Sequence, residues 1–342
     1  MRRVYSPVST TEGAAFTPLV DGSASSPRLS FLGKLLASGK AKAAGVGLLL
    51  LSLSVGLGVG LRKPAAAAAS VCEWADYRLP TNVVPTNYTI VWAPLLTPDG
   101  AAFASGCAGG SCPFNGSTTV DVVVQAAAPC ILVHSAGLRV ASAGVANLRS
   151  GAAAAASWRE DAVNERLVVA NPVAASVGDT LRLTFSFSAN LSQTNNGLYQ
   201  SVFTDDAEAT VTMLATQFEA TAARKAFVGC DEPAFKANFS LIFDGVPRGY
   251  TALSNMPNAS TAVRADGGRT VAFLTSPRMS TYLLALVCGP LVSVSAVVPA
   301  ANGPLPLAGW AVARANNTQQ LAFAVAAAAA IIPFYETLFG VP

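Results

Sequence analysis

The sequence predicts a mainly β protein: an antiparallel β-sandwich domain, preceded by one transmembrane helix and followed by the first helix of an incomplete second domain. Three observations predict this arrangement. A 19-residue stretch near the N-terminus is apolar and uncharged, and residues 77–298 alternate short β-type runs with turn-forming clusters. Residues 321–339 then change to an alanine-rich helical pattern. A chain of 342 residues is long enough for two domains at roughly 150 residues each.

The N-terminal region has the excess of positive over negative charge. Residues 1–63 hold eight Lys and Arg side chains against Glu12 and Asp21, although the net charge of the whole chain is only +3. We expect residues 1–42 to form a disordered cytoplasmic tail. The rest of the chain has no basic patch suited to nucleic acid, so nucleic acid is not an expected partner.

The apolar stretch at residues 43–61 is the predicted transmembrane anchor. Its 19 residues, at about 1.5 Å each, nearly match a hydrocarbon core of about 30 Å. Three lysines between positions 34 and 42 favour a cytosolic N-terminus, although Arg62 and Lys63 on the far side oppose this bias. The sequence therefore predicts a single-pass type II membrane protein with a lumenal or extracellular ectodomain.

Two other interpretations of the N-terminal region stay open. They are a cleaved signal peptide, for which a leader of 42 residues is long, and a Ser-rich transit peptide. Within the apolar stretch, Gly56 and Gly60 form a GxxxG pattern, which is a weak indication of a homodimer.

Sequons and cysteines agree with a lumenal or extracellular ectodomain. Every Asn-x-Ser/Thr sequon follows the apolar stretch, as expected of a glycosylated ectodomain. Cys107 and Cys112 lie in a Gly- and Ser-rich loop and form a candidate disulfide; free thiols are the main alternative, and a zinc knuckle lacks its second ligand pair. The six candidate glycosylation sites are Asn87, Asn115, Asn190, Asn238, Asn258 and Asn316.

A β domain is predicted at residues 77–307, after an Ala-rich stalk at 62–76. Alternation is cleanest at 181–187, where the odd-numbered residues form one apolar face and the even-numbered ones face water. The predicted strands are 88–92, 119–124, 130–133, 167–170, 180–187, 209–214, 239–243, 270–274 and 281–287.

Residues 308–342 are the predicted start of the second domain. A helix at 321–339 follows a cap-forming Asn and Thr cluster, and Pro333 is expected to kink it. The residues available for a buried stripe are Leu321, Val325, Ile332, Tyr335 and Phe339.

One strip of sequence carries a family resemblance. Thr216-Gln217-Phe218-Glu219-Ala220, followed by Asp231-Glu232-Pro233, resembles the substrate-facing strip of zinc aminopeptidases of the aminopeptidase N and oxytocinase type, which are gluzincins. The resemblance implies a saddle-shaped N-terminal β domain in which Gln217 and Glu219 bind substrate. Glu219 would hold the free amine of a peptide, and Gln217 would contact its first residue. Further matches follow in the family's order at 77–81, 84–88, 131–135, 197–201, 279–285 and 333–342.

The zinc site of that family cannot be built from this chain. It needs two imidazoles one helical turn apart in a His-Glu-x-x-His motif, whereas His134 is the single histidine of the sequence. The resemblance places this motif and the family's Gly-x-Met-Glu-Asn beyond residue 342. Zinc is therefore a cofactor implied for the complete enzyme, and this chain is expected to contribute no catalytic residue and no metal ligand.

The resulting hypothesis is the N-terminal, substrate-recognising portion of a membrane-anchored zinc aminopeptidase, which removes N-terminal residues from peptides. This portion is expected to be inactive alone. The alternative is a non-catalytic peptide-binding or adhesion ectodomain. At the level of single residues, spacing alone also allows Glu219 to pair with Arg224 or Lys225 on the surface.

Three neighbouring features receive structural interpretations. We expect the turn with Asp231 and Glu232 to be architectural, and His134 to be a buried strand residue. Phe227-Val228-Gly229-Cys230 departs from the family's usual Phe-Pro-Cys-Phe or Phe-Pro-Cys-Trp, which leaves the backbone at this point unspecified.

Overall fold

A computed structural model describes residues 72–95, 112–208, 210–314 and 317–341. The chain divides into two compact units, 1–62 and 63–342, and every described residue belongs to the second. The predicted tail and transmembrane anchor therefore lie outside the described residues, as do Cys107 and Asn316.

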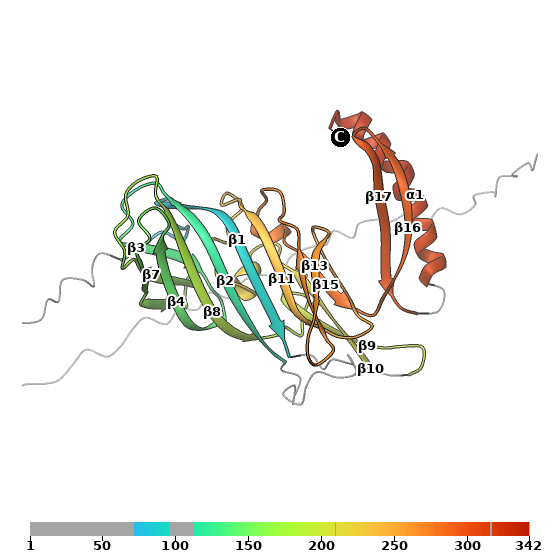
Figure 1. The fold of residues 1–342 in the computed structure, drawn as a ribbon, viewed down its shortest axis with the longest axis horizontal. Coiled ribbons are helices and arrows are strands. Elements are labelled where there is room, and N and C mark those ends of the chain that lie inside the picture. Colours follow the sequence, from blue (N-terminus) through green and yellow to red (C-terminus); the bar gives the residue numbers. More distant parts are fainter. Residues whose placement is uncertain (1–71, 96–111, 209, 315–316, 342) are drawn as a thin grey trace, which may run out of the picture. The chain divides into compact units, whose positions relative to one another are not determined.

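The largest element is an eight-stranded sheet with the order β13-β14-β11-β1-β2-β8-β4-β5, whose central strands lie next to one another in Figure 1. Its neighbouring strands are antiparallel except for β1 and β11, which are parallel. The predicted, mainly antiparallel β architecture is confirmed, and the parallel pair of β1 and β11 is an exception within this sheet. The strands are β1 (Val83–Pro94), β2 (Pro113–Val124), β4 (Arg139–Asn147), β5 (Ala153–Ala155), β8 (Thr180–Asn190), β11 (Asn238–Val246), β13 (Asn258–Val263) and β14 (Arg269–Phe273).

One face of this sheet is buried and the other faces water. Leu181, Leu183, Phe185 and Phe187 are all buried, which confirms the alternation predicted for residues 181–187. Strand β1 follows the same rule, because alternate residues of a strand point to opposite faces. Its buried side chains include Tyr88, Ile90 and Trp92.

Three smaller sheets complete the described part of the chain. A four-stranded sheet has the order β12-β15-β10-β9, with β12 (Thr251–Ser254), β15 (Leu286–Gly289), β10 (Thr210–Gln217) and β9 (Gly197–Thr204). A three-stranded sheet has the order β3-β7-β6, with β3 (Cys130–His134), β7 (Arg166–Ala170) and β6 (Trp158–Asp161). The last is a hairpin of β16 (Leu291–Ala300) and β17 (Gly303–Val312), and β17 runs through the predicted domain boundary at 307/308.

The predicted strand at 281–287 is wrong over its first half. A short 3-10 helix, η3 (Thr281–Leu283), occupies that position, and β15 begins only at Leu286. The reason is tertiary, because two hydroxyl groups at this position bond to the 218–237 segment, far away in the sequence. Ser280 donates its hydroxyl to the Pro233 carbonyl oxygen at 2.9 Å, and Thr281 donates to the Asp231 carboxylate at 2.6 Å.

The C-terminal helix forms as predicted but begins earlier. Helix α1 (Asn317–Phe339) contains Pro333 and packs along β16 and β17. Only Val325 of this helix is buried, at a point where a Cβ on Gly309 would lie 2.8 Å from its Cγ2. Within the described residues, α1 is the one helix whose length and apolar composition would allow it to cross a membrane.

The first described residues are fixed to the β domain. Cys72 forms a disulfide with Cys130 of β3, with 5.7 Å between the two Cα atoms. Arg166 donates to the carbonyl oxygens of Trp74 and Asp76, at 2.7 Å each. The end of the predicted stalk is therefore held against the sheet from Cys72 onward. Because the two cysteines are 58 residues apart, the sequence offered no signal for their pairing.

Candidate functional site

The candidate site is built around the connection between β10 and β11, here called the 218–237 loop. This loop packs against the buried face of the eight-stranded sheet. Trp92 of β1 donates its indole N–H to the Ala226 carbonyl oxygen at 2.8 Å, and the Cys230 amide donates to the Tyr88 hydroxyl oxygen at 2.9 Å. Phe218 lies edge-on to the Trp92 ring, with 6.2 Å between ring centroids. The aromatic side chains of β1 thereby fix the position of the loop.

Gln217 and Glu219 stand at the start of this loop. Gln217 is the last residue of β10, and both it and Glu219 are exposed, whereas Phe218 between them is 1% exposed. The Glu219 amide donates to the Gln217 side-chain oxygen at 3.2 Å. The peptide bond between Glu219 and Ala220 is cis. The two polar side chains are therefore in solvent, while the buried Phe218 anchors the segment between them.

The surface ion pairs considered for Glu219 do not form. Arg224 is 2% exposed and pairs with Asp231 and Glu165, and Lys225 donates to the Asn196 side-chain oxygen at 2.7 Å. Among the described residues, none donates a hydrogen bond to the Glu219 carboxylate. Its negative charge is thus accessible to a ligand.

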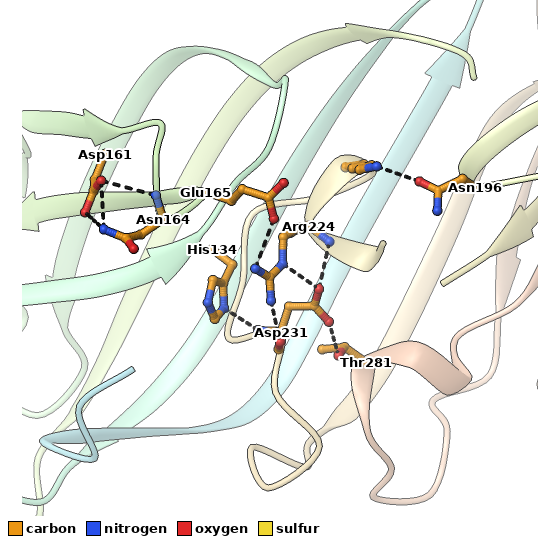
Figure 2. Close-up of polar contacts among 9 residues, drawn as sticks. His134, Asp161, Asn164, Glu165, Asn196, Arg224, Asp231 and Thr281 are labelled. Carbon is orange, nitrogen blue, oxygen red and sulfur yellow. Dashed lines mark hydrogen bonds and ion pairs between the residues drawn. The ribbon is translucent and has the colours of Figure 1, made fainter. Parts of the chain in front are cut away.

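A buried ion pair joins Arg224 and Asp231 in the middle of the 218–237 loop (Figure 2). The Arg224 guanidinium lies 3.0 Å from the Asp231 carboxylate and also donates to the Asp231 carbonyl oxygen at 3.0 Å. The Arg224 backbone amide donates to the same carboxylate at 3.2 Å. Taking two charges out of water is costly unless their remaining donors and acceptors are satisfied. This pair meets that condition with several hydrogen bonds.

Neighbouring elements extend this ion pair into a network, which Figure 2 shows around Arg224. Thr281 of η3 donates to the second carboxylate oxygen of Asp231, and Glu165 accepts from Arg224 at 3.2 Å. Glu232 accepts the Leu79 amide at 2.7 Å. The prediction that the Asp231 and Glu232 turn is architectural is confirmed by these contacts.

His134 is a buried strand residue, as predicted. It is 1% exposed in β3, and its Nδ1 accepts the Asp231 amide at 3.1 Å, a contact drawn in Figure 2. Burial lowers the pKa of His134 to about 3, with a further contribution from the positive charges of Arg224 and Arg166. The neutral imidazole thus serves as a hydrogen-bond acceptor that holds the turn.

The departure from the family pattern at residues 227–230 has a packing reason. A Cβ on Gly229 would lie 2.9 Å from Cε1 of the Tyr88 ring, which is fully buried. Gly229 also exchanges both backbone hydrogen bonds with His134. Burial raises the pKa of the neighbouring Cys230 thiol to about 12, so this cysteine is a packing residue.

The residues present do not fit a zinc ion. The imidazole of His134 is committed to the Asp231 amide. Across the described part of the chain, no group of three or more His, Cys, Asp or Glu side chains could hold a metal ion. We therefore derive no zinc-dependent step from this chain.

Comparison with known proteins agrees with the fold and with the position of the loop. The family described as the Peptidase M1 N-terminal domain matches residues 84–283, which include nearly the whole eight-stranded sheet and the 218–237 loop. The chain therefore has the N-terminal domain of an M1 peptidase.

Three curated relatives are similar to it over most of its length. Aminopeptidase N of Acetobacter pasteurianus is 33% identical over 281 residues, which cover 80% of this chain and 72% of that protein. Endoplasmic reticulum aminopeptidase 1 of Homo sapiens is 32% identical, covering 79% of this chain and 27% of the relative. Aminopeptidase N of Oryctolagus cuniculus is 35% identical, with 69% and 24% covered. The chain belongs to the aminopeptidase N family, and it spans about a quarter of the human and rabbit relatives.

Sequence reasoning named Gln217 and Glu219 as candidates but missed most of the contacts that hold the 218–237 loop in place. Arg224 was considered only as a surface partner of Glu219, whereas it is the centre of the buried network. The seven-residue separation of Arg224 and Asp231 was the one local signal for their pairing. Glu165 and Thr281 lie 59 and 50 residues from their partners, so no local pattern pointed to them.

Proposed function

We propose that this chain is the substrate-recognition portion of a membrane-anchored zinc aminopeptidase, and that Glu219 binds the free amine of a peptide. The observation that carries the proposal is the exposed Glu219 carboxylate, which no described residue pairs, on a segment anchored by Phe218. The relatives' names, which describe aminopeptidases, support the same substrate class.

The proposed binding chemistry follows from the position of the Glu219 carboxylate. A peptide's terminal ammonium needs an anion to offset its loss of water in a pocket. A carboxylate held at a fixed distance from the scissile bond would also ensure that the first peptide bond is the one positioned for cleavage. Gln217, which is also exposed, would contact the first side chain or its backbone. In a complete enzyme, a zinc ion held by other residues would supply the activation of water that hydrolysis needs.

The test is a binding measurement with the chain itself. Fluorescence polarisation would compare a short alanine peptide bearing a C-terminal fluorophore with its N-acetylated form, on wild type and Glu219→Gln. An exposed ion pair contributes up to about 1 kcal/mol, so either change should weaken binding by up to about fivefold. Combining both changes should add nothing further, because each removes the same pair. Glu160→Gln, an exposed carboxylate on β6, is the matched control.

Independent, additive losses from the two changes would show that Glu219 does not meet the amine. The chain alone should also show no zinc-dependent release of aminoacyl fluorophores. Detectable turnover by pure material would overturn the assignment to a non-catalytic portion.

The second candidate is a non-catalytic peptide-binding or adhesion ectodomain. The accessible Glu219 carboxylate supports peptide capture in that case too, since binding does not require chemistry. Reading the gene past the codon for Pro342 separates the two: His-Glu-x-x-His in frame favours the enzyme, and a stop codon confirmed in transcripts favours the ectodomain.

The remaining features of this proposal concern placement and assembly. Residues 43–61 would anchor the chain as a type II protein, with residues 1–42 in the cytosol, a stalk at 62–76, the β domain at 77–307 and the start of a catalytic domain at 308–342. Cys107 and Cys112 would form a second disulfide, and Gly56 with Gly60 would support a homodimer. The sequons that carry glycans would lie in the lumen or outside the cell. Protease protection of the N-terminal tail in sealed vesicles tests the orientation.

A further inference from the structure

Four of the sequons converge on one surface of the domain. In β1, β2, β8 and β11, the residues that alternate with the buried ones point to the water-facing side of the eight-stranded sheet. Here this side is called the outer face. The sequon asparagines on it are Asn87 of β1, Asn115 of β2, Asn190 of β8 and Asn238 of β11.

Strand register places these asparagines in two groups. Asn87 and Asn238 are direct partners in the parallel pair of β1 and β11, so about 4.8 Å separates their strands. Asn115 is opposite Ser188, which puts Asn190 at a diagonal position about 7–8 Å away. Asn87 is opposite Asp121, six residues along β2 from Asn115, and the groups are therefore about 20 Å apart.

The two adjacent asparagines differ in accessibility. Asn87 is exposed, and its side-chain nitrogen makes only a 3.4 Å contact with the Thr86 hydroxyl. Asn238 is half-buried, and its side-chain nitrogen donates to the Ser276 carbonyl oxygen at 2.8 Å. In the folded sheet, an oligosaccharide on Asn87 would occupy the space beside Asn238, and the side-chain nitrogen of Asn238 is already hydrogen-bonded to Ser276.

We propose that the outer face is a glycan-bearing surface, with N-linked oligosaccharides on Asn87, Asn115 and Asn190 and none on Asn238. In each modification, the asparagine Nδ2 bonds to C1 of an N-acetylhexosamine as the bond from that carbon to a polyprenyl pyrophosphate breaks. Nδ2 loses one proton and the lipid pyrophosphate leaves. The inference rests on the lumenal placement proposed above, because the lipid-linked donor is found on that side.

The glycan surface lies on the opposite side of β1 from the candidate peptide site. Tyr88 and Trp92 point away from Asn87 and contact the 218–237 loop through Cys230 and Ala226. Glu219 is therefore separated from the glycans by the thickness of the sheet. Sugars on the outer face would leave the Glu219 side open to a peptide.

The full chain, expressed in a secretory eukaryotic cell, provides the test. Glycosidase treatment in heavy-oxygen water marks each formerly modified asparagine for mass spectrometry. Asn258, which is exposed on the edge strand β13, serves as an internal reporter of delivery to the lumen. We expect modification of Asn87, Asn115, Asn190 and Asn258, less than a tenth occupancy at Asn238, and one band shift lost in each of N87Q, N115Q and N190Q but not in N238Q.

The glycosylation result distinguishes failure of the glycan surface from failure of the lumenal placement. Modified Asn258 with bare outer-face sequons, or Asn87 and Asn238 occupied together on one molecule, would overturn the glycan surface while leaving the lumenal placement intact. If no sequon, including Asn258, is modified, the lumenal placement fails and the glycan surface fails with it. Removing the glycans should also change peptide affinity by less than twofold, and a larger change would contradict the separation of the two sides.

Discussion

Replacing Asp231 by Asn tests whether the buried ion pair holds the 218–237 loop. Asp231 is 3% exposed and Arg224 is 2% exposed, and the carboxylate accepts from Arg224 through one oxygen and from Thr281 through the other. An asparagine has a single side-chain oxygen and cannot satisfy both donors. It would also leave the Arg224 charge buried with Glu165 as its sole anionic partner.

Removing one partner of a buried pair costs about 3–5 kcal/mol in the free energy of unfolding. With a urea dependence of about 3 kcal/mol per molar, the top of the usual range for small domains, the unfolding midpoint should fall by about 1–1.7 M. Pulse proteolysis across a urea gradient measures this midpoint on the intact chain.

Asp121→Asn is the matched control. Asp121 pairs with Arg182 through two contacts of 2.7 and 2.8 Å, but the Arg182 side chain is 45% exposed. An exposed pair contributes about 0–1 kcal/mol, so this midpoint should move by no more than about 0.3 M. Equal shifts for the two variants would refute the argument that burial makes the Asp231 pair the stronger one.

Three further changes test other contacts. The Cys72–Cys130 disulfide closes a loop between residues 58 apart, so Cys72→Ser should cost about 4 kcal/mol of unfolding free energy by loop-closure entropy; a variant with an unchanged urea midpoint would contradict this. The pKa of His134 is about 3 in the folded chain against 6.5 ordinarily, so the unfolded chain binds the proton more readily. The free energy of unfolding should therefore be highest above pH 6.5 and fall by about 1.4 kcal/mol per pH unit towards pH 3. His134→Asn keeps an acceptor for the Asp231 amide and should flatten that slope between pH 6.5 and 5.5, whereas an identical slope would exclude His134 as its source. Gly229→Ala should destabilise by about 1–3 kcal/mol, because its Cβ meets the buried Tyr88 ring, and an unchanged urea midpoint would contradict this clash.

Local patterns in the sequence predicted about half of the described strands. The predicted runs at 88–92, 119–124 and 180–187 all lie inside observed strands, because one buried face imposes a period of two. The exposed strand β13 was missed, since all its residues are exposed and no apolar alternation marks it. The run at 281–287 looked extended, but side-chain hydroxyls that bond across the fold turned its first half into η3.

In the candidate site, too, local sequence identified some residues and distant contacts determined the others. Gln217 and Glu219 were identified from a family resemblance concentrated in one continuous strip. The buried network that holds the 218–237 loop was not identified. Its members Glu165 and Thr281 come from parts of the chain distant from Arg224 and Asp231. The parallel pairing of β1 with β11 could not be predicted either, since no local sequence pattern specifies a partner strand about 150 residues away.

That pairing determines the order in which the protein can be assembled during synthesis. Asn87 and Asn238 are neighbours in space, yet a ribosome adding about 5–20 residues each second needs roughly 8–30 s to travel from one to the other. Throughout that interval β1 has an open edge on the side where β11 will add. The nascent polypeptide therefore cannot complete its largest sheet until β11 has emerged from the ribosome.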